Sequence, residues 1–593
     1  MKFSSDFLLQ KEEILDIHFS DVSYSPLFST LGLCAADDAC GIDALMFHYN
    51  RENRVLFAPF LELSGMRRVP SSMEQLCFSG EGGNAAISFY DRDRMVLSVE
   101  GGAGIPAAQL FGAAADNVCD HWTVSVCEDT LILRGYSKNT DARDPDASVP
   151  FMIGVRVLRG TLTETDGVVT LCTDGSGQLY AAVAFDALVI SADAVRDALR
   201  SAPAEYEQAR GLSRAWFASM LNGFSVTLPG EREAQILSHA LKGLLFNATV
   251  GQGALEGYVS AYPSRGTYPT HFLWDSCFQN LALEYLNPRL ARDSMLLYAQ
   301  NVRADGKFPQ FLCSTWARPH ETQPALIGWA TMRLIDAGLA DEDFIARMYD
   351  ALSRNNRWWL SQRMTRFGVL VCPHGLETGQ DDSPRFDDGP VLAVDMNSYL
   401  YSQLCAVRRM AELLGRTEDA AYWKAEADAL AAAIVDVLYD PETNFFYDAD
   451  PLTGKRRTLI SGSGFLPLWA GIEIGASRAR DMIRNHLLDP ARFWGRVPLP
   501  CIAYDQPQYR QDGWWRGPTW MSLAWLLVEM LEHYGFAEEY RHVCRVFRDM
   551  ITSDGNLREL FDSQTGAGLG AYDQGWTAAV YVKLCKLCEA FEE

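Results

Sequence analysis

The sequence has no apolar run that approaches the length needed to span a membrane, about 20 consecutive apolar residues. Its N-terminal stretch, MKFSSDFLLQKEEILDIHFS, carries acidic side chains where a signal peptide needs an uninterrupted apolar core. The 14 cysteines are scattered without regular spacing, which is typical of reduced thiols rather than of a disulfide framework. These absences predict a cytoplasmic protein with no membrane partner.

Basic residues are also few, with 52 Lys and Arg against 76 Asp and Glu and a formal net charge of −24. Binding to nucleic acid depends on Lys and Arg that neutralise phosphates, so a nucleic-acid partner is excluded. The glycine-rich run 101–104 lacks the strand and helix context of a nucleotide-binding loop, and Cys585 and Cys588 lie on an amphipathic helix where packing explains them better than zinc. The sequence predicts neither a cofactor nor a catalytic metal, and it leaves the oligomeric state open.

What the chain has in abundance is apolar and aromatic material. Hydrophobic residues make up 48% of the chain and aromatic residues 11%, including 15 tryptophans. Such a composition is typical of a globular protein with a large core, and core packing explains most of the aromatic residues. Planar apolar rings are also what the C–H faces of sugars pack against, so the tryptophans are compatible with a carbohydrate site.

The first third of the chain alternates short apolar runs with turn-rich segments, which predicts strands. The segment His121–Arg134 shows period-two alternation typical of a strand or hairpin with one buried face. Similar runs lie at 54–60, 168–172 and 179–190. We therefore predict an N-terminal antiparallel β-sandwich domain over residues 1–191, followed by a helical linker over residues 192–228.

From residue 229 to residue 593 the sequence is a succession of amphipathic helical patterns. About twelve helices are expected, at 231–247, 273–286, 288–303, 323–338, 341–363, 395–415, 417–438, 462–472, 476–488, 516–534, 536–550 and 574–592. A dozen helices joined by short and long loops fits a double ring of helices, the (α/α)6 barrel. A helical solenoid is the alternative, but no short repeat of the kind that solenoids carry is present.

The chemistry-bearing stretch is the loop ETGQDDSPR at residues 377–385, which combines three carboxylates with an arginine. Gly379 and Pro384 prevent it from continuing a helix or a strand, and helical patterns flank it on both sides. A partly desolvated carboxyl group on such a loop can carry a proton at neutral pH, which general acid catalysis requires. The alternative interpretation of the loop, taken alone, is an acidic surface turn.

Other long loops place polar residues beside tryptophans, as a hexose site would need. They are YPTHFLWD (268–275), TQP (322–324), WWRGPTW (514–520), ELFDSQTG (559–566) and GWT (575–577). Taken singly, Asp275 and Gln323 are as compatible with capping a helix or satisfying polar groups of the core as with binding a sugar. Glu559 alone is typical of a surface glutamate.

Together and in this order, the motifs WD, TQP, ETGQDDSPR, WWRGPTW, ELFDSQTG and GWT resemble the catalytic domain of glycoside hydrolase family 63, over roughly residues 230–593. That family includes α-glucosidases and mannosylglycerate or glucosylglycerate hydrolases, and the trehalases of family 37 are more distantly similar. The resemblance implies that Asp381 is the general acid and Glu559 the general base of an inverting hydrolase. Thr378 replaces the family's usual serine, and Leu560 stands where many members have an aromatic residue.

The resemblance also implies the substrate-binding residues. It assigns the sugar hydroxyls to Asp275, Gln323 and Arg516, and the walls of the site to tryptophans, with Tyr268 beside them. It assigns Glu377, Asp382 and Arg385 to the surroundings of the acid loop, where they orient the loop and set the pKa of the acid. The full set of expected binding residues is Tyr268, Trp274, Asp275, Gln323, Glu377, Asp382, Arg385, Trp515, Arg516, Trp520 and Trp576.

The predicted function is an inverting, exo-acting hydrolase of an α-linked glucoside, with an α-mannoside, mannosylglycerate or glucosylglycerate hydrolase as the alternative. A trehalase-like hydrolase is a further alternative. A glycoside phosphorylase would use phosphate in place of a base-activated water, so a glutamate in the base position argues against it. A carbohydrate-binding protein with an inactive site is the remaining alternative, and the presence of both Asp381 and Glu559 argues against it.

Overall fold

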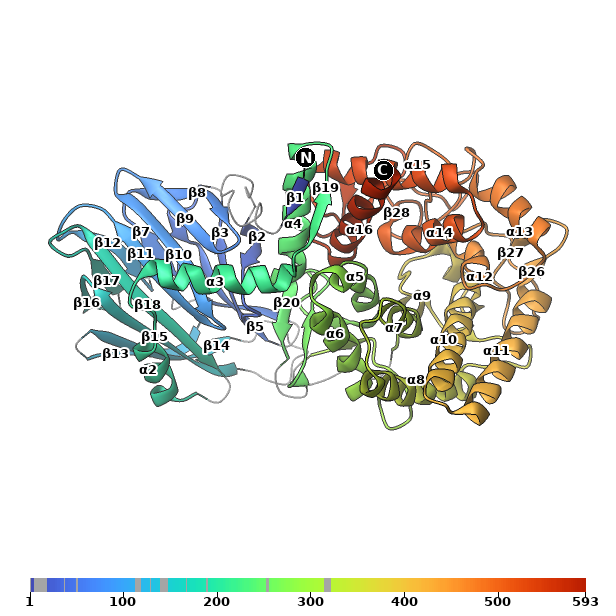
Figure 1. The fold of residues 1–593 in the computed structure, drawn as a ribbon, viewed down its shortest axis with the longest axis horizontal. Helices are drawn as coiled ribbons and strands as arrows, with labels where there is room; N and C mark the ends of the chain where they lie inside the picture. Colours follow the sequence, from blue (N-terminus) through green and yellow to red (C-terminus); the bar gives the residue numbers. More distant parts are fainter. Residues whose placement is uncertain are drawn as a thin grey trace. The chain divides into compact units, whose positions relative to one another are not determined.

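The computed structural model describes residues 2–4, 19–36, 38–49, 52–111, 119–127, 129–138, 148–166, 168–187, 190–251, 255–313 and 321–592. The chain divides into two compact units (Figure 1). The first unit comprises Met1–Ser225, Leu241–Val250 and Ser264–Pro269, and the second comprises Val226–Ala240, Gly251–Pro263 and Thr270–Glu593. The chain therefore passes between the units several times, whereas the predicted ranges 1–191, 192–228 and 229–593 are consecutive.

The first unit is built on antiparallel sheets. The largest sheet has the order β13 (Cys119–Cys127), β14 (Thr130–Lys138), β15 (Ser148–Arg159), β18 (Gln178–Ala187), β11 (Arg94–Glu100), β10 (Gly83–Asp91), β9 (Gln75–Gly80), β8 (Met66–Ser72). A second sheet has the order β16 (Thr161–Thr165), β17 (Val168–Cys172), β12 (Pro106–Leu110), β7 (Leu61–Leu63), β4 (Gly41–Ile42). A third contains β2 (Phe19–Tyr24), β3 (Leu31–Ala35), β5 (Ala44–Tyr49) and β6 (Glu52–Phe57).

The two larger sheets pack face to face. Leu110 and Leu171 of the second sheet line one small apolar gap together with Ile87, Leu97 and Val183 of the largest sheet. This is the alternation expected of a sandwich, in which every second side chain of a strand enters the core. The predicted β-sandwich is confirmed, and so is the hairpin, which the structure forms from β13 and β14.

Helices α2 (Ala192–Arg200) and α3 (Tyr206–Leu221), which fall in the predicted linker, pack against the large sheet of the first unit. Val195 and Leu199 of α2 share an apolar cluster with Ile132 and Met152 of the sheet. Glu74 is fully buried and accepts hydrogen bonds from Arg210 and Arg214 of α3, at 2.7 Å and 2.6 Å. Burial of this kind makes the two helices part of the sandwich unit.

The second unit contains a closed ring of helices. Each member packs on the next, and the last packs on the first, in the order α5 (Leu273–Leu286), α7 (Ile327–Asp336), α10 (Val394–Leu413), α12 (Leu466–Trp469), α14 (Met521–His533), α16 (Gly575–Glu592). An outer layer packs on this ring and consists of α6 (Pro288–Gln300), α8 (Glu342–Gln362), α11 (Thr417–Leu438) and α15 (Ala537–Asp554). The other long helices are α4 (Glu231–Asn247) and α13 (Ala476–Met482), the latter continued by the π-helical turn η6 (Ile483–Leu487).

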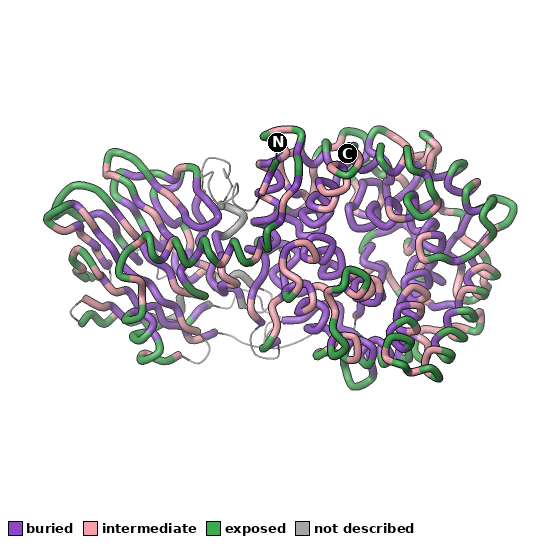
Figure 2. Tube along the Cα trace, viewed as in Figure 1, coloured by how far each residue is buried: buried purple, intermediate pink, exposed green. Residues whose placement is uncertain are grey.

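The burial pattern explains this arrangement. Ring helices such as α14 are buried on almost every side and are mostly apolar, whereas outer helices such as α8 bury one stripe and expose the other (Figure 2). Two concentric layers of helices form an (α/α)6 barrel, which confirms the predicted fold class. A solenoid would have left its first and last helices unpaired, whereas here α16 packs on α5.

All twelve predicted helical ranges contain a helix, and the main differences lie at two starting points. Helix α7 begins at Ile327 rather than at 323, and α14 begins at Met521 rather than at 516. Pro324 and Pro518 keep Gln323 and Gly517 out of helical conformation, and the strand β28 (Thr519–Trp520) separates Pro518 from the start of α14. The predicted helix starts at 323 and 516 were therefore wrong, and the polar residues there lie on loops.

Short strands and turns stabilise the long loops of the second unit. They are β22 (His271–Phe272) with β23 (Phe311–Leu312), β24 (Val371–Cys372) with β25 (Val391–Leu392), β26 (Tyr439–Asp440) with β27 (Phe445–Phe446), and β28 (Thr519–Trp520), β29 (Leu560–Phe561) and β30 (Gly568–Leu569). Short helical turns of this unit are α9 (Gly375–Thr378), η4 (Pro384–Phe386) and η5 (Gly462–Phe465). The remaining short strands are β21 (Val259–Ala261) in the second unit, β1 (Lys2–Ser4) and β20 (Ala248–Val250) in the first, and β19 (Ser225–Thr227), where the chain passes from the first unit to the second.

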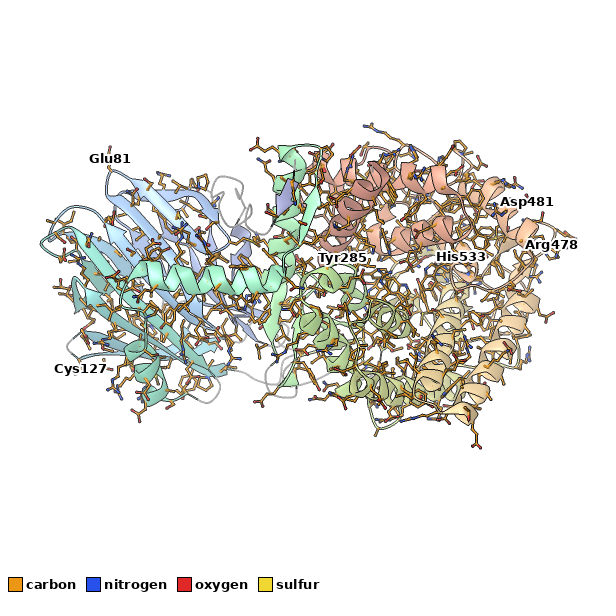
Figure 3. The ribbon with its side chains drawn as sticks, in the orientation of Figure 1. Glu81, Cys127, Tyr285, Arg478, Asp481 and His533 are labelled. Carbon is orange, nitrogen blue, oxygen red and sulfur yellow. The ribbon has the colours of Figure 1, made fainter. Side chains whose placement is uncertain are left out.

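Charged side chains cover the surface of each unit. Glu81, at the turn between β9 and β10, and Arg478 of α13 both project outward (Figure 3). Within the described ranges, none of the helices has the length and apolar character to cross a membrane. The thirteen cysteines whose side chains are described form no disulfide bond.

Candidate active site

The loop that carries Asp381 is shaped by a helical turn and a glycine. Helix α9 ends at Gly379, whose φ of 72° is left-handed and is the usual end of such a turn. A Cβ atom at this position would lie 2.6 Å from Cζ2 of Trp274, so the backbone here packs directly on the indole ring. Asp381 follows two residues later and is exposed. The glycine therefore brings the loop of Asp381 against the N-terminal turn of α5.

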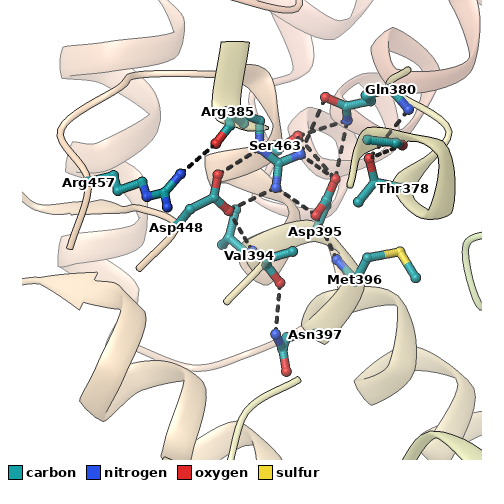
Figure 4. Close-up of polar contacts among 12 residues, drawn as sticks. Thr378, Gln380, Arg385, Val394, Asp395, Met396, Asn397, Asp448, Arg457 and Ser463 are labelled. Atoms are coloured by element: carbon teal, nitrogen blue, oxygen red, sulfur yellow. Dashed lines mark hydrogen bonds and ion pairs between the residues drawn. The ribbon is translucent and has the colours of Figure 1, made fainter. Parts of the chain in front are cut away.

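The other end of this loop is anchored by Arg385, which is buried (Figure 4). Its Nε and Nη2 atoms donate to Asp448 at 2.7 Å and 2.8 Å, and its Nη1 and Nη2 atoms donate to Asp395 at 2.5 Å and 2.8 Å. Burial alone would lower the pKa of Arg385, but Asp395 and Asp448 outweigh it and hold the pKa well above its usual value. The guanidinium thus joins the loop to the start of α10 and to the segment that follows β27.

The same guanidinium reaches the residue next to Asp381. Nη1 of Arg385 lies 3.3 Å from Oε1 of Gln380 and 3.0 Å from Oγ of Ser463. Nε2 of Gln380 donates to Oγ of Ser463 at 2.9 Å and to Oδ2 of Asp395 at 3.3 Å (Figure 4). Gln380 is therefore held by a buried network immediately before the exposed Asp381.

Further ion pairs secure the loop from outside. Glu377 is buried and forms an ion pair with Arg363 at 2.6 Å. Oδ1 of Asp382 accepts the main-chain N–H of Trp515 at 2.7 Å. The guanidinium of Arg516 binds Asp387 through two hydrogen bonds, at 3.0 Å and 2.5 Å, and lies 3.6 Å from Asp382. These contacts engage Glu377, Asp382 and Arg516 within the protein, and the predicted contact of Arg516 with sugar hydroxyls stays a prediction.

Four of the predicted tryptophans form one cluster. Trp515 and Trp520 stack with ring centroids 3.8 Å apart and an angle of 7° between their planes. Trp274 packs on Trp515 and Trp576, and Trp576 packs on Trp520, at centroid distances of 5.8–5.9 Å. All four are no more than 4% exposed, so most of each ring contacts protein rather than solvent. Core packing accounts for most of their surface, and the predicted wall of a sugar site stays a prediction.

Glu559 lies directly before β29 and is 3% exposed. Its main-chain N–H donates to the carbonyl of Ala571 at 3.0 Å, and the N–H of Ala571 donates to Oε2 of Glu559 at 2.9 Å. A Cβ atom at Gly570 would lie 2.6 Å from the same carboxylate oxygen, so a glycine is needed for this approach. The Nε1 atom of Trp576 donates to the main-chain carbonyl of Glu559 at 2.9 Å. These contacts fix both the backbone and the carboxylate of Glu559.

Asp275 brings the two ends of the site together. It lies in the first turn of α5, is 4% exposed, and its Oδ1 atom accepts a long hydrogen bond of 3.4 Å from Nε2 of Gln574. Burial raises the pKa of the Asp275 carboxyl well above its usual value, and the carboxylates of Glu559 and, more weakly, Asp381 raise it further. Both predicted catalytic carboxylates therefore lie within electrostatic reach of Asp275, although they are far apart in sequence.

Gln323 and Tyr268 each form a hydrogen bond within the protein. The Oε1 atom of Gln323 accepts the main-chain N–H of Trp274 at 3.2 Å, so Gln323 satisfies one of the open donors at the start of α5. Tyr268 belongs to the first unit, where its main-chain N–H donates to the carbonyl of Ser264 at 2.7 Å. For both residues the predicted contact with sugar stays a prediction.

Residues that the sequence analysis missed complete the surroundings of the site. They are Gln380, Asp395, Asp448, Ser463 and Gln574. Gln380 lies within the ETGQDDSPR motif but was given no role, Gln574 adjoins the GWT motif, and the other three belong to none of the motifs. Among the described residues, no group of three or more His, Cys, Asp or Glu side chains could hold a metal ion.

Comparisons with known proteins agree on one family. A family model described as the mannosylglycerate hydrolase MGH1-like glycoside hydrolase domain matches residues 268–577, just over half of the chain. Mannosylglycerate hydrolase of Thermus thermophilus is 25% identical over 401 residues, which cover 54% of this chain and 94% of that protein. Glucosylglycerate hydrolase of Mycolicibacterium hassiacum is 24% identical over 411 residues, 53% of this chain and 91% of that protein.

Solved structures share the fold. The GH63 mannosylglycerate hydrolase of Thermus thermophilus, in complex with Tris and D-glycerate, superposes with a TM-score of 0.52 at 21% identity, over 59% of this chain and 99% of that chain. A family GH92 α-mannosidase of Bacteroides thetaiotaomicron superposes with a TM-score of 0.58 at 11% identity, over 97% of this chain and 83% of that chain. The second likeness extends over the sandwich as well as the barrel.

Proposed function

Because this chain belongs to the mannosylglycerate hydrolase MGH1-like glycoside hydrolase family, we propose that it is an inverting, exo-acting α-glycosidase with Asp381 as general acid and Glu559 as general base. The observation that carries the proposal is that Glu559 and Asp381 both lie within electrostatic reach of Asp275. The charges of Glu559 and Asp381 both raise the pKa of Asp275, which lies in the buried first turn of α5. Glycosidic cleavage needs one protonated carboxyl group beside the leaving oxygen and a second carboxylate on the opposite face of the sugar.

The surroundings of the two carboxyl groups suit these separate roles. Asp381 is exposed at the tip of an anchored loop, where it can give a proton to a leaving group and be reprotonated from solvent. Glu559 is buried and its Oε2 atom accepts the N–H of Ala571, a hydrogen bond that favours the ionised form a base requires. The cleavage would begin with transfer of the Asp381 proton to the leaving oxygen while Glu559 removes a proton from the attacking water.

The substrate we propose is an α-linked hexoside with a small aglycone. The sequence motifs favour α-glucosides, and relatives whose names specify mannosylglycerate and glucosylglycerate extend the panel to the glycerate conjugates of mannose and glucose. A trehalase-like activity belongs to the same panel, because a probable trehalase of Eremothecium gossypii is 27% identical over 214 residues. A cytoplasmic location is part of this proposal.

The test is hydrolysis of this panel by the wild-type chain and by Asp381→Asn and Glu559→Gln. Loss of a general acid or base costs about 10²- to 10⁴-fold in rate, so each variant should retain the far-ultraviolet spectrum of the wild type and lose nearly all turnover. Near-normal turnover by either variant on a substrate of the wild type would refute the role given to that residue. Turnover that depends on added phosphate would instead identify a phosphorylase, and sugar binding without turnover an inactive binding protein.

A further inference from the structure

The segment 570–575, between β30 and α16, contacts both the base and the third carboxyl group of the site. Ala571 exchanges two hydrogen bonds with Glu559, one of them to the carboxylate. Gln574 donates from its side chain to Asp275 at 3.4 Å and from its main chain to the carbonyl of Leu557 at 2.8 Å. A displacement of this segment would therefore move the surroundings of Glu559 and Asp275 at the same time.

Asp573 lies between those two contacts in an unusual conformation. Its φ of 49° is left-handed, which is uncommon for a residue with a side chain, and it is only 3% exposed. Its Oδ1 atom contacts Nε2 of His239, a residue of α4 whose side chain is 17% exposed. Both residues belong to the second unit, so the contact joins α4 to the segment that supports the proposed base.

The neighbours of the segment leave it little room to shift. A Cβ atom at Gly570 would lie 2.6 Å from the Glu559 carboxylate, and one at Gly575 would collide with Nε2 of Gln279. The N–H of Gly575 donates to the carbonyl of Pro263 at 2.6 Å. Between these close-packed glycines, the contact of Asp573 with His239 joins the segment to α4.

We infer that His239 and Asp573 act as a positioning pair for the proposed base. The imidazole of His239 holds the carboxylate of Asp573 in place, and this contact holds the strained backbone at Asp573. The backbone in turn places the N–H of Ala571 against Oε2 of Glu559. The inference rests on the proposed role of Glu559. We therefore expect the pair to affect kcat rather than KM, because the pair sets the orientation of the Glu559 carboxylate that would activate water.

Substitutions can separate this role from a purely structural one. Asp573→Gly accepts the left-handed backbone readily but removes the carboxylate, whereas Asp573→Asn tolerates the same backbone and keeps a side-chain oxygen beside Nε2 of His239. His239→Ala removes the partner at a partly exposed helix position where alanine is well tolerated. Asp428→Asn, in the exposed ion pair of Lys424 with Asp428, is the matched control.

The measurements are kcat and KM on the best wild-type substrate of the panel above, and the melting temperature of every variant. We expect Asp573→Gly and His239→Ala each to lower kcat by about 10- to 100-fold with KM changed by less than about threefold, as for a misplaced catalytic group. Asp573→Asn should restore most of the rate. The double variant His239→Ala with Asp573→Gly should be no slower than the slower single variant, because the two residues act as one unit.

Other outcomes overturn the inference. Wild-type kcat in Asp573→Gly would mean that only the backbone shape matters, and fully multiplicative losses in the double variant would mean that the two residues act independently. A fall in kcat that Asp573→Asn does not relieve, or that merely follows the melting temperature, would assign the pair to folding. If the wild-type chain hydrolyses no member of the panel, the proposed function itself fails, and the role of the pair fails with it.

Discussion

Replacing Arg385 by lysine tests the anchor of the acid loop most directly. The guanidinium forms four hydrogen bonds to two buried carboxylates, Asp395 and Asp448, and reaches Ser463 and Gln380 as well. Lysine keeps the positive charge but loses the planar fork, so it cannot serve both carboxylates in the same geometry. At least one carboxylate then loses paired hydrogen bonds in a site without solvent, which is the costly way to disturb a buried ion pair.

The expected cost follows from the burial. Breaking a buried pair typically costs about 3–5 kcal/mol, and because lysine retains the charge we expect about 3 kcal/mol, at the low end of that range. Arg408→Lys is the control, because Arg408 forms an exposed pair with Glu412 one helical turn away, and such pairs contribute about 0.3–0.5 kcal/mol. Since Gln380 adjoins Asp381, Arg385→Lys should also lower kcat by about 10- to 100-fold with a smaller effect on KM.

Urea unfolding followed by tryptophan fluorescence is a suitable assay, because 13 of the 15 tryptophans lie after residue 230 and therefore report on the helical unit. Far-ultraviolet circular dichroism of the same samples would show whether the sandwich unfolds in a separate transition. Equal urea midpoints for Arg385→Lys and Arg408→Lys would refute the energetic argument. A large loss of stability with unchanged kcat would show that the network stabilises the barrel without positioning the acid.

Three further predictions concern the site itself. Trp520→Ala should lower kcat/KM if the ring lines the sugar site, and a matching loss of thermal stability with unchanged kinetics would favour core packing alone, as the stacking on Trp515 allows. Because the pKa of Asp275 is raised in the folded state, the wild type should lose stability as pH rises from about 4, where the unfolded carboxyl group ionises, through the folded pKa. Asp275→Asn lacks this ionisation, so its melting temperature should rise relative to that of the wild type over the same pH range. A difference that stays constant with pH would contradict this. Proton NMR of the first sugar released from an α-glycoside should show the β-anomer, whereas initial release of the α-anomer would remove Glu559 from the role of base.

Much of the fold could be predicted because it depends on periodic patterns. Helical periodicity placed all twelve helices of the barrel, and strand alternation placed the hairpin of β13 and β14. The family resemblance, carried by the order of six short motifs, is confirmed by the family model. The two shifted starts, at α7 and α14, lie beyond Pro324 and Pro518, because the residue before each proline is disfavoured in a helix although the apolar pattern continues through it.

The surroundings of the site could not be predicted, because long-range contacts leave no periodic signal. Arg385 was expected to orient the acid loop, but its partner Asp448 lies 63 residues away in a segment whose sequence is typical of an ordinary turn. Arg516 was expected to hold sugar hydroxyls, and the described structure engages its guanidinium with Asp387. A basic side chain beside tryptophans suits both a sugar contact and an ion pair, so only the position of the Asp387 carboxylate distinguishes the two roles.

The loops that carry the proposed acid and the proposed base are held in different ways, and this difference suits the two tasks proposed for them. The loop of Asp381 is anchored on both sides by ion pairs, through Arg385 inside and Arg516 outside, and its carboxyl group remains exposed. Glu559 is fixed by hydrogen bonds to its own carboxylate and backbone and is removed from solvent. An acid must follow a leaving oxygen and regain a proton from water, whereas a base of an inverting enzyme must hold one water in line with the anomeric carbon. Asp381 is accessible and is supported through its neighbours, whereas Glu559 is buried and its carboxylate is supported directly. Each arrangement suits the task proposed for that residue.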